Sequence, residues 1–538
     1  MTSRSKSSFS LTAALALTSA ALLGCGSSSA PASEGSSSGG GSSGGSGSGS
    51  GGSSGGSDAG SDTGSVTQLD GSAPPSDAST KLAPAITCAT AAVVGLHWGA
   101  ITGAGHYGVS RGSTAMGTTV TTAFADTSVA AKTAYSYTVT AYDPTGTAIT
   151  SAMISATTAA ASANGDAPYC PSTVIKSATW NWSTGFNQQN GSDLWPSTWG
   201  ADGNVYLFFG DGGGFFGSNT NGRASFGIAT IHGTKPVVNS GEATNVFGGL
   251  DAPHPSTING KAGSIIAIGS DFYALGGIYG DPGDAPGPSG SPNHYEIVAS
   301  IGNAYSWKDT SWRFCAADSS GKPTLGTYCA TGFVNFGKGN AGAIDAYVYM
   351  TAAPVLGWFG TAPPGPANTY MERVLSTQIT TQSAYTFYAG LDATGQPLWS
   401  SDATKAQPIF TDRNTKPMGI GIVYNAPLNR FIASAQGGVV AQAALYESQY
   451  PWGPWATISY ANTNPDGTGG WGDLGSDYPS GSGDSLGINF NNAWTSPDGL
   501  TMWATFSSDG DAPSTALLPG LASQPMDAFS LVSVTLGQ

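Results

Sequence analysis

The chain has 538 residues, a formal net charge of −15 at pH 7, and charged side chains at only 9% of its positions. Neutralising phosphates requires clustered Lys and Arg, so this charge balance argues against a nucleic-acid partner. Aromatic residues make up 10% of the chain and glycines number 79, a composition that suits exported β-structure.

Residues 1–25 have the pattern of a targeting signal. A positively charged start precedes an apolar stretch at 9–23, which is too short to span a bilayer comfortably. The stretch ends in Leu-Leu-Gly-Cys, which resembles the bacterial lipoprotein cleavage box. The resemblance implies that Cys25 becomes a lipid-modified N-terminus; the alternative is an ordinary secretory signal. Gly26, in place of the Asp typical of inner-membrane retention, favours an outer-membrane or cell-surface location, with a periplasmic or secreted protein as the alternative.

Residues 26–82 are almost entirely Ser and Gly. Such a segment cannot bury apolar surface, so we expect a flexible tether with a typical span of roughly 40 Å. A membrane partner through Cys25 and a folded part held away from the membrane follow from this arrangement.

Residues 83–160 predict a small β-sandwich, because short strand-like runs alternate with turn residues. The run DTSVAAKTAYSYTVTAYDPTG at 126–146 resembles the late strands of a fibronectin type III domain. Trp98 and Tyr135 match the core tryptophan and corner tyrosine of such domains. The resemblance implies a spacer, so no site is assigned to this module.

Four cysteines besides Cys25 are expected to form disulfides in an exported chain. Cys315 and Cys329 are close in sequence and are expected to bridge a loop. Cys88 and Cys170 bracket the sandwich and are candidates to clasp its ends. No Cys-x-x-Cys pair occurs and the five His are scattered, so we predict neither a metal site nor a cofactor.

Residues 168–538 lack helical periodicity and repeat one hairpin plan. Five turn-centred strand pairs, separated by 67–84 residues, lie near Gly203, Ser270, Ile344, Leu428 and Asp498. This spacing predicts an all-β, five-bladed β-propeller in which segment 173–182 pairs with the last strand at 529–536. A six-bladed propeller and two packed sandwiches are the alternatives.

The hairpin at 191–215, GSDLWPSTWGADGNVYLFFGDGGGF, is the segment expected to carry chemistry. Asp193 enters its first strand and Asp211 leaves its second, so the hairpin brings both carboxylates to one end. A three-residue loop at 201–203 would place them opposite each other on one face. A two-residue loop at 202–203 would shift the register by one and turn them to opposite faces.

Seven segments between 190 and 537 support a family resemblance: the hairpin itself, FVNFGKGNAGAIDAYVYM, MERV, YTFYAGLDATGQPLW, GIVYNAPLNRFIAS, YPWGPWATISY and WTSPDGLTMWATFSSDGDAPSTALLPG. They resemble a large, mostly uncharacterised bacterial family with a "domain of unknown function" label, related to propeller endo-D-arabinanases. The resemblance implies two catalytic Asp in the first blade, which match Asp193 and Asp211. The Asp-Leu-Trp-Pro run after the first acid departs from the relatives' pattern.

Two carboxylates are what glycoside hydrolysis requires, one as acid and one as base or nucleophile. Asp345 is a third catalytic candidate that would orient a partner or shift its pKa. Candidates for substrate binding are Trp195, Asn335, Lys338, Asn340, Glu372, Tyr424 and Asn425. The alternative for these residues is structural, as turn caps or as core between blades.

The leading hypothesis is therefore a monomeric, surface-tethered glycoside hydrolase that cleaves a furanose-containing, arabinan-like polysaccharide. A non-catalytic propeller that binds glycan or protein is the alternative from another class. A sialidase is a third, since five arginines are available, although none has a diagnostic setting: Arg223, Arg313, Arg373, Arg413 and Arg430.

Overall fold

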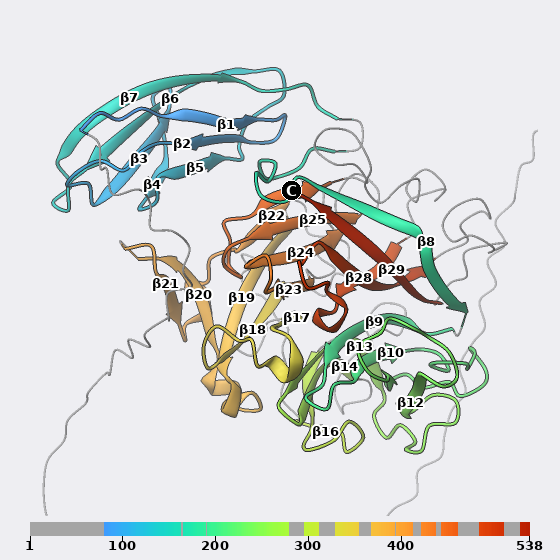
Figure 1. Ribbon diagram of the computed structural model, residues 1–538. Coiled ribbons are helices and arrows are strands. Elements are labelled where there is room, and N and C mark those ends of the chain that lie inside the picture. Colours follow the sequence, from blue (N-terminus) through green and yellow to red (C-terminus); the bar gives the residue numbers. More distant parts are fainter. Residues whose placement is uncertain are drawn as a thin grey trace, which may run out of the picture. The chain divides into compact units, whose positions relative to one another are not determined.

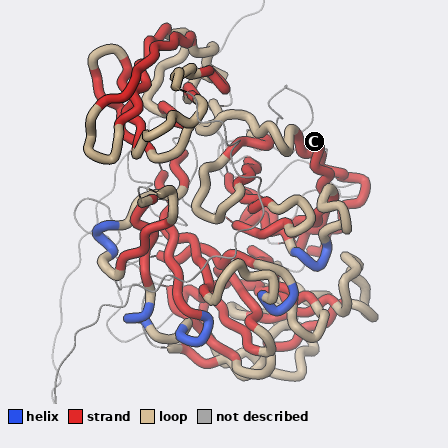
Figure 2. The backbone as a smooth tube through the Cα atoms, turned by 60° about the vertical axis from the view of Figure 1, so that its left-hand side comes forward, coloured by secondary structure: helices blue, strands red, loops and turns tan. Residues whose placement is uncertain are grey.

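The computed structural model describes residues 80–162, 165–189, 191–278, 295–310, 329–353, 367–392, 394–412, 421–436, 443–460, 484–509 and 528–538. The expected targeting signal, most of the tether, Cys25, Cys315 and the side chain of Cys329 lie outside the described residues. In those ranges the chain forms strands, loops and short 3-10 turns (Figures 1 and 2). None of the helical turns found there has the length and hydropathy of a membrane span. The expected all-β class is confirmed.

Residues 85–157 form a sandwich of two antiparallel sheets, as expected. One sheet has the order β1 (Ala85–Ala89), β2 (Val94–His97), β5 (Ala123–Asp126); the other has the order β4 (Thr114–Thr119), β3 (His106–Arg111), β6 (Ala134–Tyr142), β7 (Ala148–Thr157). Trp98 and Tyr137 are buried between them. Tyr135 accepts a hydrogen bond at its hydroxyl from Ala130 N, 2.8 Å away.

A disulfide joins Cys88 to Cys170 across 82 residues. This pairing was predicted from the positions of the two cysteines on either side of the sandwich. It ties β1 to the segment that leads into the second half of the chain.

The remaining strands form three four-stranded sheets and one ten-stranded sheet. The first has the order β12 (Ala243–Phe247), β11 (Gly227–Ile231), β10 (Val205–Gly210), β9 (Asp193–Trp199), and the second β13 (Gly260–Ile268), β14 (Asp271–Ile278), β15 (Tyr295–Ser300), β16 (Lys308–Asp309). The ten-stranded sheet contains β17 (Cys329–Asn335), β18 (Tyr347–Ala353), β19 (Ala367–Leu375), β20 (Thr386–Leu391), β21 (Pro397–Ser400), β22 (Phe410–Asp412), β23 (Gly421–Asn425), β24 (Arg430–Gln436), β25 (Ala443–Ser448) and β26 (Ala456–Ser459). Its two antiparallel halves are joined by the parallel pair β17 and β23.

The last sheet has the order β27 (Asp484–Phe490), β28 (Thr501–Asp509), β29 (Ala528–Gly537), β8 (Ser177–Gln189). Its outer strand comes from the beginning of this half of the chain and pairs with the last strand, from Ser177 opposite Gly537 to Gln189 opposite Ala528. The predicted pairing of these distant segments is confirmed.

Five inner strands contact one another in cyclic order: β9, β13, β17, β23, β27 and β9 again. Small hydroxyl side chains hydrogen-bond to the backbone of neighbouring sheets at several of these contacts. Thr198 accepts from Ala267 N at 3.0 Å, Ser434 donates to Ile488 O at 2.6 Å, and Thr505 donates to Trp195 O at 2.8 Å. These bonds satisfy buried backbone groups, and the cyclic contacts give the region a propeller-like organisation.

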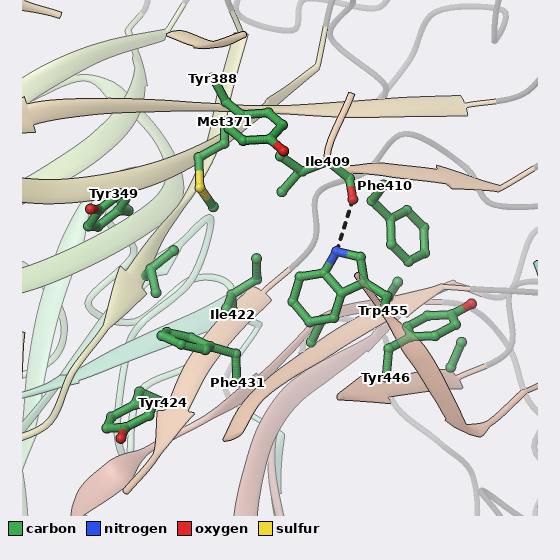
Figure 3. Close-up of a cluster of buried hydrophobic side chains, with 14 of the residues drawn as sticks. Tyr349, Met371, Tyr388, Ile409, Phe410, Ile422, Tyr424, Phe431, Tyr446 and Trp455 are labelled. Atoms are coloured by element: carbon green, nitrogen blue, oxygen red, sulfur yellow. Dashed lines mark hydrogen bonds between the residues drawn. The ribbon is translucent and has the colours of Figure 1, made fainter. Parts of the chain in front are cut away.

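Aromatic side chains fill the space between the two halves of the ten-stranded sheet (Figure 3). Trp455 points toward β22 and donates a hydrogen bond from Nε1 to Ile409 O at 2.9 Å. Tyr446, Phe410 and Phe431 are buried in the same cluster. Rigid packing of this kind fixes the spacing of the inner strands.

Candidate active site

The turn of the β9–β10 hairpin has the three-residue loop that was one of the two predicted alternatives. Gly200 N donates to Asn204 O at 2.8 Å, so residues 201–203 form the loop. Gly203 has φ +95°, a conformation that favours glycine. Trp199 accordingly pairs with Val205, the register that, continued, would place Asp193 opposite Asp211.

A β-bulge in β9 then changes this register. Ser197 pairs with Leu207, but Leu194 pairs with Phe209 and Asp193 with Gly210. The extra residue is accommodated because Leu194 and Trp195 adopt left-handed backbone conformations, with φ +75° and +57°. Asp193 therefore lies opposite Gly210, and the direct pairing with Asp211 that a three-residue loop alone would give does not form.

Asp211 leaves the sheet directly after β10, with φ +57°. The next residue has to be glycine, because a Cβ on Gly212 would lie 2.1 Å from the carbonyl carbon of Gly191. This close approach of two backbone segments redirects the chain at the hairpin end. The carboxylate of Asp211 thereby returns to the side on which Asp193 lies.

Lys261, the second residue of β13, brings the two acids together. Its Nζ lies 3.7 Å from Asp193 Oδ2 and forms a closer ion pair with Asp211 Oδ2. Because both distances are measured from the same Nζ and neither exceeds 3.7 Å, Asp193 Oδ2 and Asp211 Oδ2 are less than twice 3.7 Å apart. Sequence reasoning missed Lys261, although an isolated cation in the small, apolar run Gly-Lys-Ala-Gly-Ser-Ile-Ile was a signal for it.

Asp193 is buried, with 5% of its surface exposed. Burial raises the pKa of its carboxyl above the usual value, against the opposing attraction of Lys261. Its Oδ1 has no hydrogen-bond partner among the described residues. A Cβ on Gly210 would lie 2.9 Å from that oxygen, so the glycine leaves room beside it.

Asp211 is more exposed and is paired with a second cation. Arg223 Nη2 lies 3.6 Å from Asp211 Oδ1, and Nη1 donates to the Asp211 carbonyl oxygen and to Asn219 Oδ1, the latter at 2.8 Å. An isolated bridge between Gly212 and Ala224 closes the base of this loop. Asp211 thus lies beside two cations, Lys261 and Arg223.

Two substrate-binding candidates lie in the core instead. Trp195 is fully buried against Phe209, Phe215 and Phe529, so it offers no ring face to a sugar. Glu372 is 1% exposed on β19, and burial raises the pKa of its carboxyl well above the usual value. Neither side chain therefore presents a surface to a ligand in this structure.

Asn335, Lys338 and Asn340 gather at the turn end of the β9–β10 hairpin, whereas Asp193 and Asp211 lie at its other end. Asn335 Oδ1 accepts from Thr198 at 2.9 Å, and Asn340 Oδ1 accepts from Phe336 N at 3.2 Å. Lys338 Nζ lies beside Gly203. The structure forms the predicted polar cluster but does not bring it to the acid pair.

Asp345, Tyr424 and Asn425 have local structural partners. Asp345 accepts hydrogen bonds from Tyr347 N at 2.9 Å and from Tyr349 Oη at 2.5 Å. Tyr424 donates to Asn429 Oδ1 at 2.8 Å, and Asn425 Oδ1 accepts from Leu428 N at 3.2 Å. These contacts stabilise turns, and Asp345 does not join the acid pair.

The part of the chain that the structure describes contains no group of three His, Cys, Asp or Glu side chains able to hold a metal ion. The site therefore consists of Asp193, Asp211, Lys261 and Arg223. We call these four residues the carboxylate cluster. In this cluster a buried acid, Asp193, and a more exposed acid, Asp211, share the ammonium group of Lys261.

No family model matches the chain. A poly(3-hydroxybutyrate) depolymerase of Ralstonia pickettii is 46% identical over 78 residues, which are 14% of this chain and 16% of the relative. Exoglucanase B of Cellulomonas fimi is 40% identical over 94 residues, 16% of this chain and 9% of the relative. The chain thus spans less than a fifth of either curated relative.

Solved structures with a partial likeness cover a larger share of the chain. A GH43_1 enzyme from Xanthomonas citri is 10% identical in sequence. The match covers 66% of this chain and 91% of that enzyme's chain, with a TM-score of 0.35. An α-L-arabinofuranosidase from Podospora anserina in complex with cellotriose is 9% identical, with 68% and 99% coverage and a TM-score of 0.35. The catalytic domain of a GH62 α-L-arabinofuranosidase from Coprinopsis cinerea is 9% identical, with 67% and 98% coverage and a TM-score of 0.34. TM-scores this low do not support an argument about function, which therefore rests on the carboxylate cluster.

Proposed function

We propose that the chain is a glycoside hydrolase with a five-bladed propeller, and that Asp193 and Asp211 are its catalytic acids. The observation that carries the proposal is the meeting of both carboxylates at one Lys261 ammonium, at the hairpin end. The five-blade count is supported by the cyclic contacts of the inner strands and by the β8–β29 pairing.

The two acids have environments that suit different roles. Burial favours the protonated form of Asp193, as required of the group that protonates the leaving glycosidic oxygen. Asp211 lies beside two cations, Lys261 and Arg223, which compensate the negative charge of a carboxylate that acts as a base on water or as a nucleophile at the anomeric carbon. We therefore assign Asp193 as general acid and Asp211 as base or nucleophile.

The proposed substrate is a furanose-containing polysaccharide. Its support is the resemblance of residues 190–537 to relatives of endo-D-arabinanases. Incubating the full chain with arabinans and other cell-wall glycans, and analysing released oligosaccharides, tests the activity. Absence of products from the whole panel would contradict the proposal.

A non-catalytic glycan-binding protein is the second candidate. The observation that favours it is the double ion pairing of Lys261, because a shared cation also neutralises two acids in a purely structural cluster. Glycan binding without turnover would identify this case.

We further propose that the protein is anchored to the bacterial cell surface through a lipid on Cys25, with residues 26–82 as tether and 83–160 as a fibronectin type III-like spacer. Incorporation of a labelled fatty acid into the full chain, but not into Cys25→Ser, tests the anchor.

Removing the shared cation is expected to change the pH profile. In Lys261→Met the ionised form of Asp193 loses its stabilising charge, so the pKa of this carboxyl rises further. Since a general acid must be protonated, the alkaline limb of kcat/KM should move to higher pH by about one unit. Lys261→Arg, which keeps the charge, should retain the original limb. A limb that stays in place or moves to lower pH in Lys261→Met would contradict the assignment of Asp193 as acid.

A further inference from the structure

A groove of about 690 Å³ lies along the first sheet, separate from the four side chains of the carboxylate cluster. This volume lies within the roughly 300–1,000 Å³ typical of small-ligand sites. We call it the Phe216 groove, and the lining residues used below are Phe216, His232, Thr244, Asp251, His254 and Tyr305.

Flat aromatic surfaces are available in this groove. The rings of His254 and Tyr305 stack at a centroid distance of 4.0 Å, with 7° between their planes. Tyr305 and Phe216 each expose 43% of their surface. Large exposed rings around a hollow are typical of a binding site.

The backbone holds Phe216 in its exposed position. Its φ is +61°, a conformation uncommon for a non-glycine residue, and Asp251 on the same groove has φ +53°. Phe216 N donates to Gln188 Oε1 at 3.0 Å, and the preceding Phe215 N donates to Asn245 Oδ1 at 2.8 Å. Strained backbone held by specific bonds is found preferentially at functional sites.

The polar groups of the groove indicate an uncharged ligand. No Lys or Arg is among its described lining residues, while Asp251 contributes a carboxylate. Thr244 Oγ1 and His232 Nε2, both in the lining, are hydrogen-bonded to each other at 3.3 Å and supply a polar edge. Flat rings beside hydroxyl, imidazole and carboxylate groups suit a neutral, polyhydroxylated molecule and disfavour an anion.

Phe216 belongs to the loop that begins at Asp211 and closes at the Gly212–Ala224 bridge. We propose that the Phe216 groove is a carbohydrate subsite, which binds a neutral segment of the polysaccharide away from the bond that is cleaved. This inference rests on the proposed function for its ligand class, whereas binding at the groove is measurable without turnover.

The test is affinity electrophoresis of the full chain through gels that contain soluble arabinan, arabinogalactan or arabinoxylan. Every protein carries Asp211→Asn, so that hydrolysis does not consume the matrix. Phe216→Ala and Tyr305→Ala should each weaken retardation by about fivefold to tenfold, because each removes one ring face. Tyr450→Ala is the matched control, since Tyr450 is 41% exposed and stacks on Trp452 elsewhere. Thermal unfolding of each variant verifies folding.

The outcomes separate the two proposals. Weakened binding in both groove variants, in a protein whose parent chain releases no oligosaccharides, would support the subsite and overturn the hydrolase. Release of oligosaccharides by the parent chain, with retardation unchanged in both folded groove variants, would overturn the subsite alone. If the Asp211→Asn chain without a groove substitution is not retarded in any of the three gels, the subsite is also overturned.

Discussion

Replacing Asp211 with Asn is expected to lower kcat on the polysaccharide by about 10²–10⁴-fold, the usual contribution of general acid–base catalysis. Asn keeps the size of the side chain but neither accepts a proton nor attacks the anomeric carbon. Asp193→Asn should lower kcat by a similar factor, because an amide cannot protonate the leaving oxygen. Initial rates of oligosaccharide release measure both effects.

Asp202→Asn is the matched control on the same hairpin. Asp202 accepts hydrogen bonds from Asn204 and Tyr206 at the turn end, opposite the carboxylate cluster. This variant should keep kcat within about twofold, because surface substitutions have small effects. Equal losses in Asp202→Asn and Asp211→Asn, or full activity of a folded Asp211→Asn, would contradict the catalytic assignment.

Replacing Trp195 with Ala is expected to reduce the free energy of unfolding by about 3–5 kcal/mol, as for other large-to-small core substitutions of aromatics. Trp195 is fully buried, with ring centroids 5.1 Å from Phe209, 5.2 Å from Phe215 and 4.9 Å from Phe529. Its Nε1 also donates to Ser192 O at 3.1 Å, next to Asp193. Denaturant unfolding of the full chain measures the change.

Trp195→Phe is the comparison, since it keeps most of the packing and loses the hydrogen bond. It should cost less than Trp195→Ala, and sugar affinity should follow folding in both variants. A Trp195→Ala protein with parental stability and weakened glycan binding would show that the indole acts as a sugar platform after all.

Local sequence patterns predicted the architecture in several places. Alternating apolar residues and turn residues predicted the sandwich, and the Ala-Asp-Gly-Asn turn located the β9–β10 hairpin but left two loop lengths open, between which the structure decides. The last repeat unit was one strand short, so segment 173–182 was predicted to supply its outer strand, and β8 does pair with the last strand. These features depend on hydrophobic periodicity and turn chemistry, which are readable over short distances in the chain.

The sequence singled out two acids as candidates, but it did not predict how their side chains are arranged. Asp193 and Asp211 follow from the hairpin and from the family resemblance. Trp195, Glu372 and Asn425 are buried in the structure, which the sequence did not reveal, because an aromatic, acidic or amide residue in a strand or turn has the same local pattern in a core as in a site. Burial, which comes from neighbouring sheets, distinguishes the two cases.

The sequence by itself determined the β-class, the hairpin and the position of both acids at its ends. Only the tertiary structure decided how the acids meet, because the bulge at Leu194 and Trp195 and the turn at Asp211 depend on packing and close backbone approach. The same holds for Lys261, which lies 50 residues after Asp211 and reaches the acids only because β13 packs beside β9. A local pattern can single out a residue such as Lys261, but its distant partners are fixed by the packing of whole sheets, which short-range patterns do not specify.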